Sequence, residues 1–322
     1  MNVEAFQQAV DITAWRRDEE FAHYPEGARD KTLVYSPDKA PFSFLLLGHR
    51  YLFKRSSPRY PEHFWMEIIA YHLGLQMGVP VPKTFAGYDT KEGQSGALIE
   101  WFFFPQRGTE TYIAGGDFCQ QYIPNFDRKK GKQHNFETVA QIFADLKQKH
   151  PLFHADWKAY WAKAFVFDAL IGNTDRHQDN WGIIEKFVST EERTHQEITI
   201  SPVFDNGTSL GYNILAPKFS DFEKECSLEK HFSRGWHHMK WEVSDQTQMN
   251  HCDFLKKFSE KYPETMMIML TSLKKVNFPA LKHILESLTH LKLPVKLSSD
   301  RASFVLRLLQ FRHKRLLLEL DK

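Results

Sequence analysis

"GNTDRHQDNWGII", residues 172–184, places a group of strongly polar side chains between two apolar segments. The preceding "WAKAFVFDALI" (161–171) has the pattern of a buried helix, and "WGII" that of a short strand. Glycine, asparagine and aspartate favour turns for backbone reasons alone, so a helix-to-strand turn is one interpretation. A catalytic loop is the other, because phosphoryl transfer needs a carboxylate that orients the attacking hydroxyl and an amide that holds a metal ion. Asp175 and Asn180 would supply both groups from one rigid loop.

A second acidic signal follows in "ISPVFDNGTSLG", residues 200–211. Asp205 is expected at the end of an apolar strand, just before a glycine turn. This pattern is also typical of an ordinary hairpin tip. Beside the loop of Asp175 and Asn180, however, it would deliver a second metal ligand, since Mg²⁺ binds few carboxylates together with phosphate oxygens.

Upstream, Lys54 ends the predicted strand "HRYLFK", and Glu67 lies in a predicted helix that begins at Pro61. A strand lysine or a helix glutamate on its own is usually a solvated side chain. Their order and spacing also fit a lysine that contacts nucleotide phosphates and is held in place by a helix glutamate.

Two further segments are candidates for nucleotide binding. "YPEGARDK" (24–31) could place backbone amides over phosphates, although it has a single glycine where phosphate loops often have two or three. "GALIEWF" (96–102) is expected to join two lobes, with backbone near Glu100 and Trp101 available to a purine. The predicted contacts in the first segment are Gly27, Ala28 and Lys31.

The order of predicted elements indicates an α+β, two-lobed, protein-kinase-like fold. Residues 1–104 would form a small β-rich lobe with one helix, and residues 105–322 a larger, mostly helical lobe. Within the second lobe, 105–134 is expected to be a linker or surface excursion, and 181–213 a β-rich patch. The more detailed predictions are a helix in 1–15, strands in 30–37, 42–47, 49–55, 82–89 and 95–104, and a helix in 61–78.

Composition indicates a soluble globular protein. Of the 322 residues, 42% are hydrophobic and 25% charged, and a net charge of +2 gives no sign of nucleic-acid binding. Three widely spaced cysteines favour a reducing compartment. No signal peptide and no apolar run long enough to cross a membrane is visible, so we expect a cytoplasmic protein without membrane insertion.

The sequence resembles the HipA-like kinases, a family of bacterial serine/threonine kinases. The similarity spans about residues 20–213 and is carried by "EGARDK" (26–31), "YLFK" (51–54), "WMEIIAYHLG" (65–74), "NTDRHQDNWG" (173–182) and "SPVFDNGTS" (201–209). The D-R-H-x-x-N core also resembles the phosphoinositide-kinase catalytic loop. A lipid kinase and a pseudokinase that acts as a binding module are therefore alternatives.

The resemblance implies an ATP- and Mg²⁺-dependent protein kinase. It would make Asp175 the catalytic aspartate, Asn180 and Asp205 the Mg²⁺ ligands, Lys54 the phosphate contact and His177 a brace of the loop. It also implies a protein substrate and allows for an antitoxin or other regulatory partner, or for secretion into a host cell as an effector. Two features depart from the family. The chain starts almost at the phosphate loop, and "YPE" (24–26) stands where members often carry a self-phosphorylated serine.

A protein acceptor is favoured over a lipid by the segment expected to face it. "EKFVSTEERTHQE" (185–197) has four glutamates against one lysine and one arginine, so it should repel anionic lipid. The basic "DRKKGK" (127–132) and the side chain of Asp179 are expected to be solvated.

Overall fold

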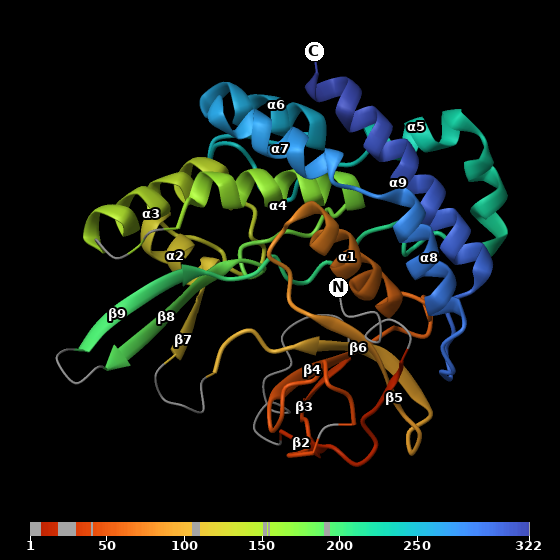
Figure 1. Ribbon diagram of the computed structural model, residues 1–322. Helices are drawn as coiled ribbons and strands as arrows, with labels where there is room; N and C mark the ends of the chain where they lie inside the picture. The colour runs from red at the N-terminus through yellow and green to blue at the C-terminus, as the bar shows by residue number, and fades with distance from the viewer. Residues whose placement is uncertain are drawn as a thin grey trace.

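The computed structural model describes residues 8–18, 30–39, 41–104, 110–150, 153, 155–189 and 194–321. A β-sheet part at the bottom of Figure 1 lies below a helical part at the top. The predicted α+β kinase-like architecture is therefore confirmed.

The N-terminal part contains, within the described residues, a six-stranded sheet in the order β1-β5-β6-β4-β3-β2. β1 pairs with β5 in parallel, and the remaining neighbours pair antiparallel. The register of β3 and β4 places Lys31 opposite Lys54. The strands are β1 (Val10–Asp11), β2 (Arg16–Arg17), β3 (Lys31–Tyr35), β4 (Arg50–Arg55), β5 (Thr84–Asp89) and β6 (Gln94–Glu100).

Helix α1 (Phe64–Met77) is buried on nearly all sides between this sheet and the helical part. It contacts β5 and β6 on one side and α4, α7 and α8 on the other. A helix buried all round needs apolar residues on every face, which "FWMEIIAYHLGLQM" supplies. Gly78 ends it in the left-handed conformation, with φ at 70°. The two parts thus share one hydrophobic core.

A second sheet, three-stranded within the described residues, extends from the helical part as a ribbon (Figure 1). It consists of β7 (Glu110–Ala114), β8 (Gly182–Ser189) and β9 (Thr194–Ile200), and α2 (Gly115–Tyr122) follows β7 directly. The expectation that 105–134 is a linker was therefore wrong for 110–122. β7 is stabilised by pairing with β8, about 70 positions later in the chain, and a local pattern does not reveal such a partner.

The helical part is built around α4, which is buried on nearly all sides and contacts α1, α6, α7 and α9. No helix in the described part of the chain is long and apolar enough to cross a membrane. The helices are α3 (Phe136–Lys149), α4 (Trp157–Ile171), the 3₁₀ helix η4 (Ala216–Glu223), α5 (Glu225–Ser233), α6 (His251–Lys261), α7 (Glu264–Lys274), α8 (Phe278–Thr289) and α9 (Ser299–Leu320).

Three local predictions differ from the structure. Val10–Asp11 is a strand and not part of a helix, while residues 1–7 lie outside the described residues. Residues 42–47 form turns because Phe44 and Leu45 are buried in the core on the sheet's other face, where they stabilise a compact loop. Residues 201–213 contain no strand among those described, so the β-rich patch ends with β9.

Candidate active site

The loop between α4 and β8 holds Asp175 and Asn180 in one closed turn. Gly172 ends α4 in the left-handed conformation, and the loop begins at Asn173. The Asn180 side-chain amide donates to the Asp175 carbonyl at 2.7 Å. The backbone N–H of Asp175 donates to Asn173 Oδ1 at 3.0 Å. The carboxylate of Asp175 is half-buried and accepts from Thr208 Oγ1 at 3.3 Å.

Arg176 is the brace of this loop. Its buried guanidinium donates from Nε and Nη2 to the buried Asp168 carboxylate of α4, at 3.0 and 2.7 Å. It also donates to Asn206 Oδ1 at 2.7 Å and to the Phe204 carbonyl. Burial alone would lower the pKa of Arg176, but Asp168 leaves that pKa above its usual value. The guanidinium therefore joins α4, the loop and the segment 204–206.

His177, predicted to brace the loop, has a more local contact. Its Nδ1 accepts from the backbone N–H of Asp179 at 3.2 Å, and its ring packs edge-on against His238. The tie to α4 and to the segment 204–206 comes from Arg176, so a catalytic or bracing role of His177 stays a prediction.

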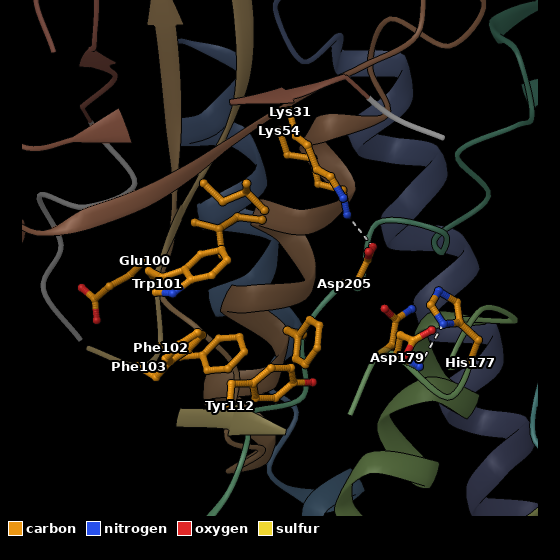
Figure 2. A pocket seen from close by; sticks show the side chains of 14 residues that line it. Lys31, Lys54, Glu100, Trp101, Phe102, Phe103, Tyr112, His177, Asp179 and Asp205 are labelled. Carbon is orange, nitrogen blue, oxygen red and sulfur yellow. Dashed lines mark hydrogen bonds and ion pairs between the residues drawn. The ribbon is translucent and has the colours of Figure 1, made fainter. Parts of the chain in front are cut away.

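Lys54, Glu67 and Asp205 meet at one point, although they come from β4, α1 and the loop after β9. Lys54 Nζ lies 2.9 Å from Glu67 Oε1. It also lies 2.5 Å from Asp205 Oδ1, a contact drawn as a dashed line in Figure 2. Glu67 Oε2 accepts from the backbone N–H of Asn206 at 2.9 Å. Lys54 and Glu67 are only 5% and 4% exposed, so each charge depends on the other for compensation.

Asp205 was expected at the end of a strand, but β9 ends at Ile200. Asp205 instead lies in a loop in the left-handed region, with φ at 55°, a conformation that aspartate and asparagine tolerate better than most residues. This backbone turn directs the carboxylate towards Lys54.

A cavity of about 470 Å³ lies beside these groups (Figure 2). Its apolar side is formed by rings, with Phe102 and Phe204 centred 5.0 Å apart and Phe103 stacked on Tyr112 at 5.7 Å. The lining also includes polar and charged side chains, among them Lys31, Lys54, His177, Asp179, Asn180 and Asp205.

The backbone at Glu100 and Trp101 is less available to a purine than predicted. The N–H of Trp101 donates to the Arg50 carbonyl at 3.1 Å, and the Trp101 carbonyl lies 2.8 Å from His49 Nε2. The N–H of Glu100 donates to the Lys83 carbonyl. Phe102 and Phe103 line the cavity, and within the described part of the chain their backbone groups have no such hydrogen bond, so the expected purine contact moves to these two residues.

A second cavity, of about 530 Å³, contains Asp175. It shares four lining residues with the first cavity, so the two spaces meet at Lys31, Lys54, His177 and Asp205. No described residue of 185–197 lines the second cavity. The described residues of this segment, 185–189 and 194–197, lie on β8 and β9, so they do not form the face that was used to disfavour a lipid acceptor.

Asp179 is ion-paired and not simply solvated. Arg128 Nε and Nη2 lie 3.0 and 2.8 Å from Asp179 Oδ1, and Arg128 Nη1 lies 2.5 Å from Asp117 of α2. Arg128 thus connects α2 to the loop after α4, where Asp179 lies 51 positions further along the chain than Arg128. Neither this contact nor the one between Asp168 and Arg176 was recognised from the sequence. Of the predicted phosphate-loop contacts, Gly27 and Ala28 lie outside the described residues.

Oxygen atoms of Asn180, which lines the first cavity, and of Asp205, which lines both cavities, fit a Mg²⁺ ion. Asn180 uses its amide nitrogen for the Asp175 carbonyl, so its oxygen remains for a cation. Asp205 keeps a carboxylate that is 31% exposed. Among the described residues, no cluster of three or more His, Cys, Asp or Glu could hold a metal alone. Two protein oxygens supplemented by phosphate oxygens is a donor set that Mg²⁺ accepts.

Comparison with known proteins decides the family. The profile of the HipA-like C-terminal domain matches residues 25–252. The chain belongs to this family. A segment of 82 residues is 34% identical to the serine/threonine-protein kinase CtkA of Helicobacter pylori strain J99 and covers 26% of this chain. The same match covers 22% of the length of that relative.

Solved structures show the same HipA-like fold over nearly the whole chain. The crystal structure of the H. pylori proinflammatory kinase CtkA superposes with a TM-score of 0.71 at 16% identity, over 97% of this chain and 96% of that one. HipA of Shewanella oneidensis, solved with HipB and operator DNA, gives a TM-score of 0.50 at 13% identity, over 96% and 73% of the two chains. At these identities the likeness concerns the fold.

Proposed function

We propose that this HipA-like protein is an ATP- and Mg²⁺-dependent protein serine/threonine kinase. The coarser assignment, a kinase-like phosphotransferase, is supported by the family and by the kinase names of its relatives. The observation that carries the proposal is the meeting of two cavities at Lys54 and Asp205, with Asp175 lining the second of these two but not the first. Such an arrangement allows a nucleotide in the first cavity and an acceptor in the second, with their reacting groups close together.

The first cavity suits the nucleotide. Its aromatic side chains form an apolar surface against which a purine base could pack. The backbone at Phe102 and Phe103 would contact the edge of the base. Lys54 would contact the phosphates as a compact point charge, and Glu67 fixes its position.

The second cavity suits the acceptor. The Asp175 carboxylate would accept the proton of a serine or threonine hydroxyl as that oxygen attacks the terminal phosphate. Asn180 and Asp205 would hold Mg²⁺, which neutralises charge on the phosphate oxygens when it is bound. Arg176 would hold the Asp175 carboxylate and both metal ligands at fixed positions relative to one another, because it binds Asp168 and the segment 204–206 at the same time.

Transfer from [γ-³²P]ATP tests this proposal. We expect purified protein with Mg²⁺ to label serine or threonine in proteins of a lysate, and Asp175→Asn to leave them unlabelled. Phosphoinositide vesicles should stay unlabelled under the same conditions. Labelled vesicles without labelled protein would replace the proposal by a lipid kinase, and no transfer to either would favour a pseudokinase.

A further inference from the structure

A groove of about 580 Å³ runs from the acceptor cavity towards α5 and α9. The two spaces share Thr174, Thr208 and Tyr212, and Thr208 contacts the Asp175 carboxylate. A chain segment whose hydroxyl reached Asp175 would therefore lie next to this groove.

The groove is rich in positive charge. Lys218, Lys230 and Arg234 line it with exposed side chains, and no ion pair of these three is seen in the part of the chain that the structure describes. Asp221 is the acidic residue of the lining. Two nearby acids, one in η4 and one in α5, contact arginines of α9. Glu223 lies 3.8 Å from Arg307, and Glu229 lies 3.0 Å from Arg315, both arginines belonging to α9.

Arg312 adds a buried charge to the wall of the groove. Its guanidinium is 1% exposed and donates from Nε and Nη2 to carbonyls of α4, Ala169 and Leu170, whereas Nη1 has no partner among the described residues. Burial lowers its pKa to about 10, so it remains charged at neutral pH. Gly172, which also lines the groove, packs against this guanidinium, because a Cβ at Gly172 would lie 3.3 Å from Nη1.

A second buried polar atom without a partner among the described residues lies in the same wall. His231 Nδ1 has no partner among the described residues, and burial lowers the pKa of this histidine to about 4. Buried polar groups are normally paired, and an unpaired one is unfavourable, more so when it is charged. The negative charge of an anion bound in the groove would offset the unfavourable burial of the Arg312 charge. The same anion could form ion pairs with the exposed Lys218, Lys230 or Arg234.

We infer that this basic groove binds an anionic group of the acceptor protein, a carboxylate of Asp or Glu or a phosphoryl group, close to the hydroxyl that is phosphorylated. This deepens the proposed function and rests on it. A concave groove with donors in its wall fits a side chain of an extended peptide better than the flat surface of a membrane, so we assign it to a protein. The substrates would then carry acidic residues near the acceptor.

A peptide array tests the inference. Serine and threonine peptides carry glutamate, phosphoserine, glutamine or lysine at each position around the acceptor, and kcat/KM is measured for the wild type. We expect glutamate or phosphoserine at one or two positions to be preferred over glutamine on the order of tenfold, as for charge-assisted contacts. Comparing glutamate with phosphoserine identifies the source of the charge.

Two double variants make the test specific. In Lys230→Gln/Arg234→Gln the ratio of acidic to neutral peptide should fall towards one. Lys274→Gln/Lys282→Gln, two exposed lysines of α7 and α8, should keep the wild-type ratio. The inference is overturned if kcat/KM is the same for acidic and neutral peptides, or if Lys230→Gln/Arg234→Gln keeps the preference for acidic peptides. The kinase assignment would stand in either case.

Binding gives a readout that does not depend on activity. If the wild type phosphorylates nothing, the proposed function fails, and fluorescence anisotropy of labelled glutamate and phosphoserine peptides still tests the groove. Binding that is lost in Lys230→Gln/Arg234→Gln, and kept in the α7/α8 control, supports the anion site. Binding of phosphoinositide vesicles in place of the peptides, with the same dependence on Lys230 and Arg234, overturns the assignment to a protein.

Discussion

Replacing Lys54 by methionine separates the structural role of the buried ion pair from its role in catalysis. Lys54 Nζ lies 2.9 Å from Glu67 and 2.5 Å from Asp205, inside a region where Glu67 is almost inaccessible to water. The methionine fills a similar volume but leaves the Glu67 carboxylate without this ammonium. The N–H of Asn206 still donates to Glu67, which limits the loss.

The magnitude follows from burial. Removing one partner of a buried ion pair costs about 3–5 kcal/mol. Since Lys54 lines the cavities and the Asp205 side chain is 31% exposed, we expect the lower end, about 3 kcal/mol, or a Tm lowered by roughly 4–5 °C. Lys83→Met is the matched control. Its lysine is 49% exposed and lies 3.4 Å from Glu100, so we expect less than about 1 kcal/mol.

The double variant Lys54→Met/Glu67→Leu completes the cycle. It removes both buried charges, so its destabilisation should be smaller than the sum of the two single effects. Urea unfolding measures all four proteins, and phosphate transfer should be lost in every variant that lacks Lys54. The reasoning is refuted if Lys54→Met is no more destabilising than Lys83→Met, or if the two single effects simply add.

Three further predictions concern the metal, the loop and the histidines. Asp205→Asn keeps a residue type that tolerates φ of 55°, and calorimetry should show that Mg²⁺ no longer strengthens ATP binding; unchanged Mg²⁺ dependence would contradict the ligand role. Arg128→Gln should lower kcat roughly ten- to hundredfold with little change in ATP affinity, because Asp179 loses its support, whereas Lys130→Gln, whose lysine pairs with Asp127 on the surface, should not. Burial lowers the pKa of His72 and of His237 to about 4, below the usual 6.5, so the folded state disfavours their protonation. Stability should therefore be present above pH 6.5 and fall as the pH drops towards 4, by about 3 kcal/mol for each histidine. Equal free energies of unfolding at pH 7 and pH 4.5 would contradict this.

The sequence reveals those features that depend on neighbouring residues. α1 and α4 have apolar residues on every face, and the loop from Asn173 to Asn180 follows a glycine that ends α4, so a local pattern was enough to predict them. The order of Lys54, Glu67, Asp175 and Asp205 was sufficient to propose one site, and the structure brings Lys54, Glu67 and Asp205 into contact.

Long-range contacts account for what was missed. Arg128 looks like part of a solvated basic segment, and its contact with Asp179 depends on how α2 packs beside the loop. Turns replace the predicted strand at 42–47 because Phe44 and Leu45 fill a core whose other residues come from several strands. The bonds of the Trp101 backbone depend on His49 and Arg50, which a sequence pattern does not place beside it.

Single-turnover transfer from [γ-³²P]ATP by Asp175→Asn tests the central claim most directly. Asp175 lines the acceptor cavity and not the nucleotide cavity, so the variant should unfold like the wild type and bind ATP with the same affinity. The amide cannot accept the hydroxyl proton, so the rate of transfer should fall by about 10²–10⁴-fold. A folded, ATP-binding Asp175→Asn protein that transfers phosphate at nearly the wild-type rate would contradict the assignment of this loop as the catalytic centre.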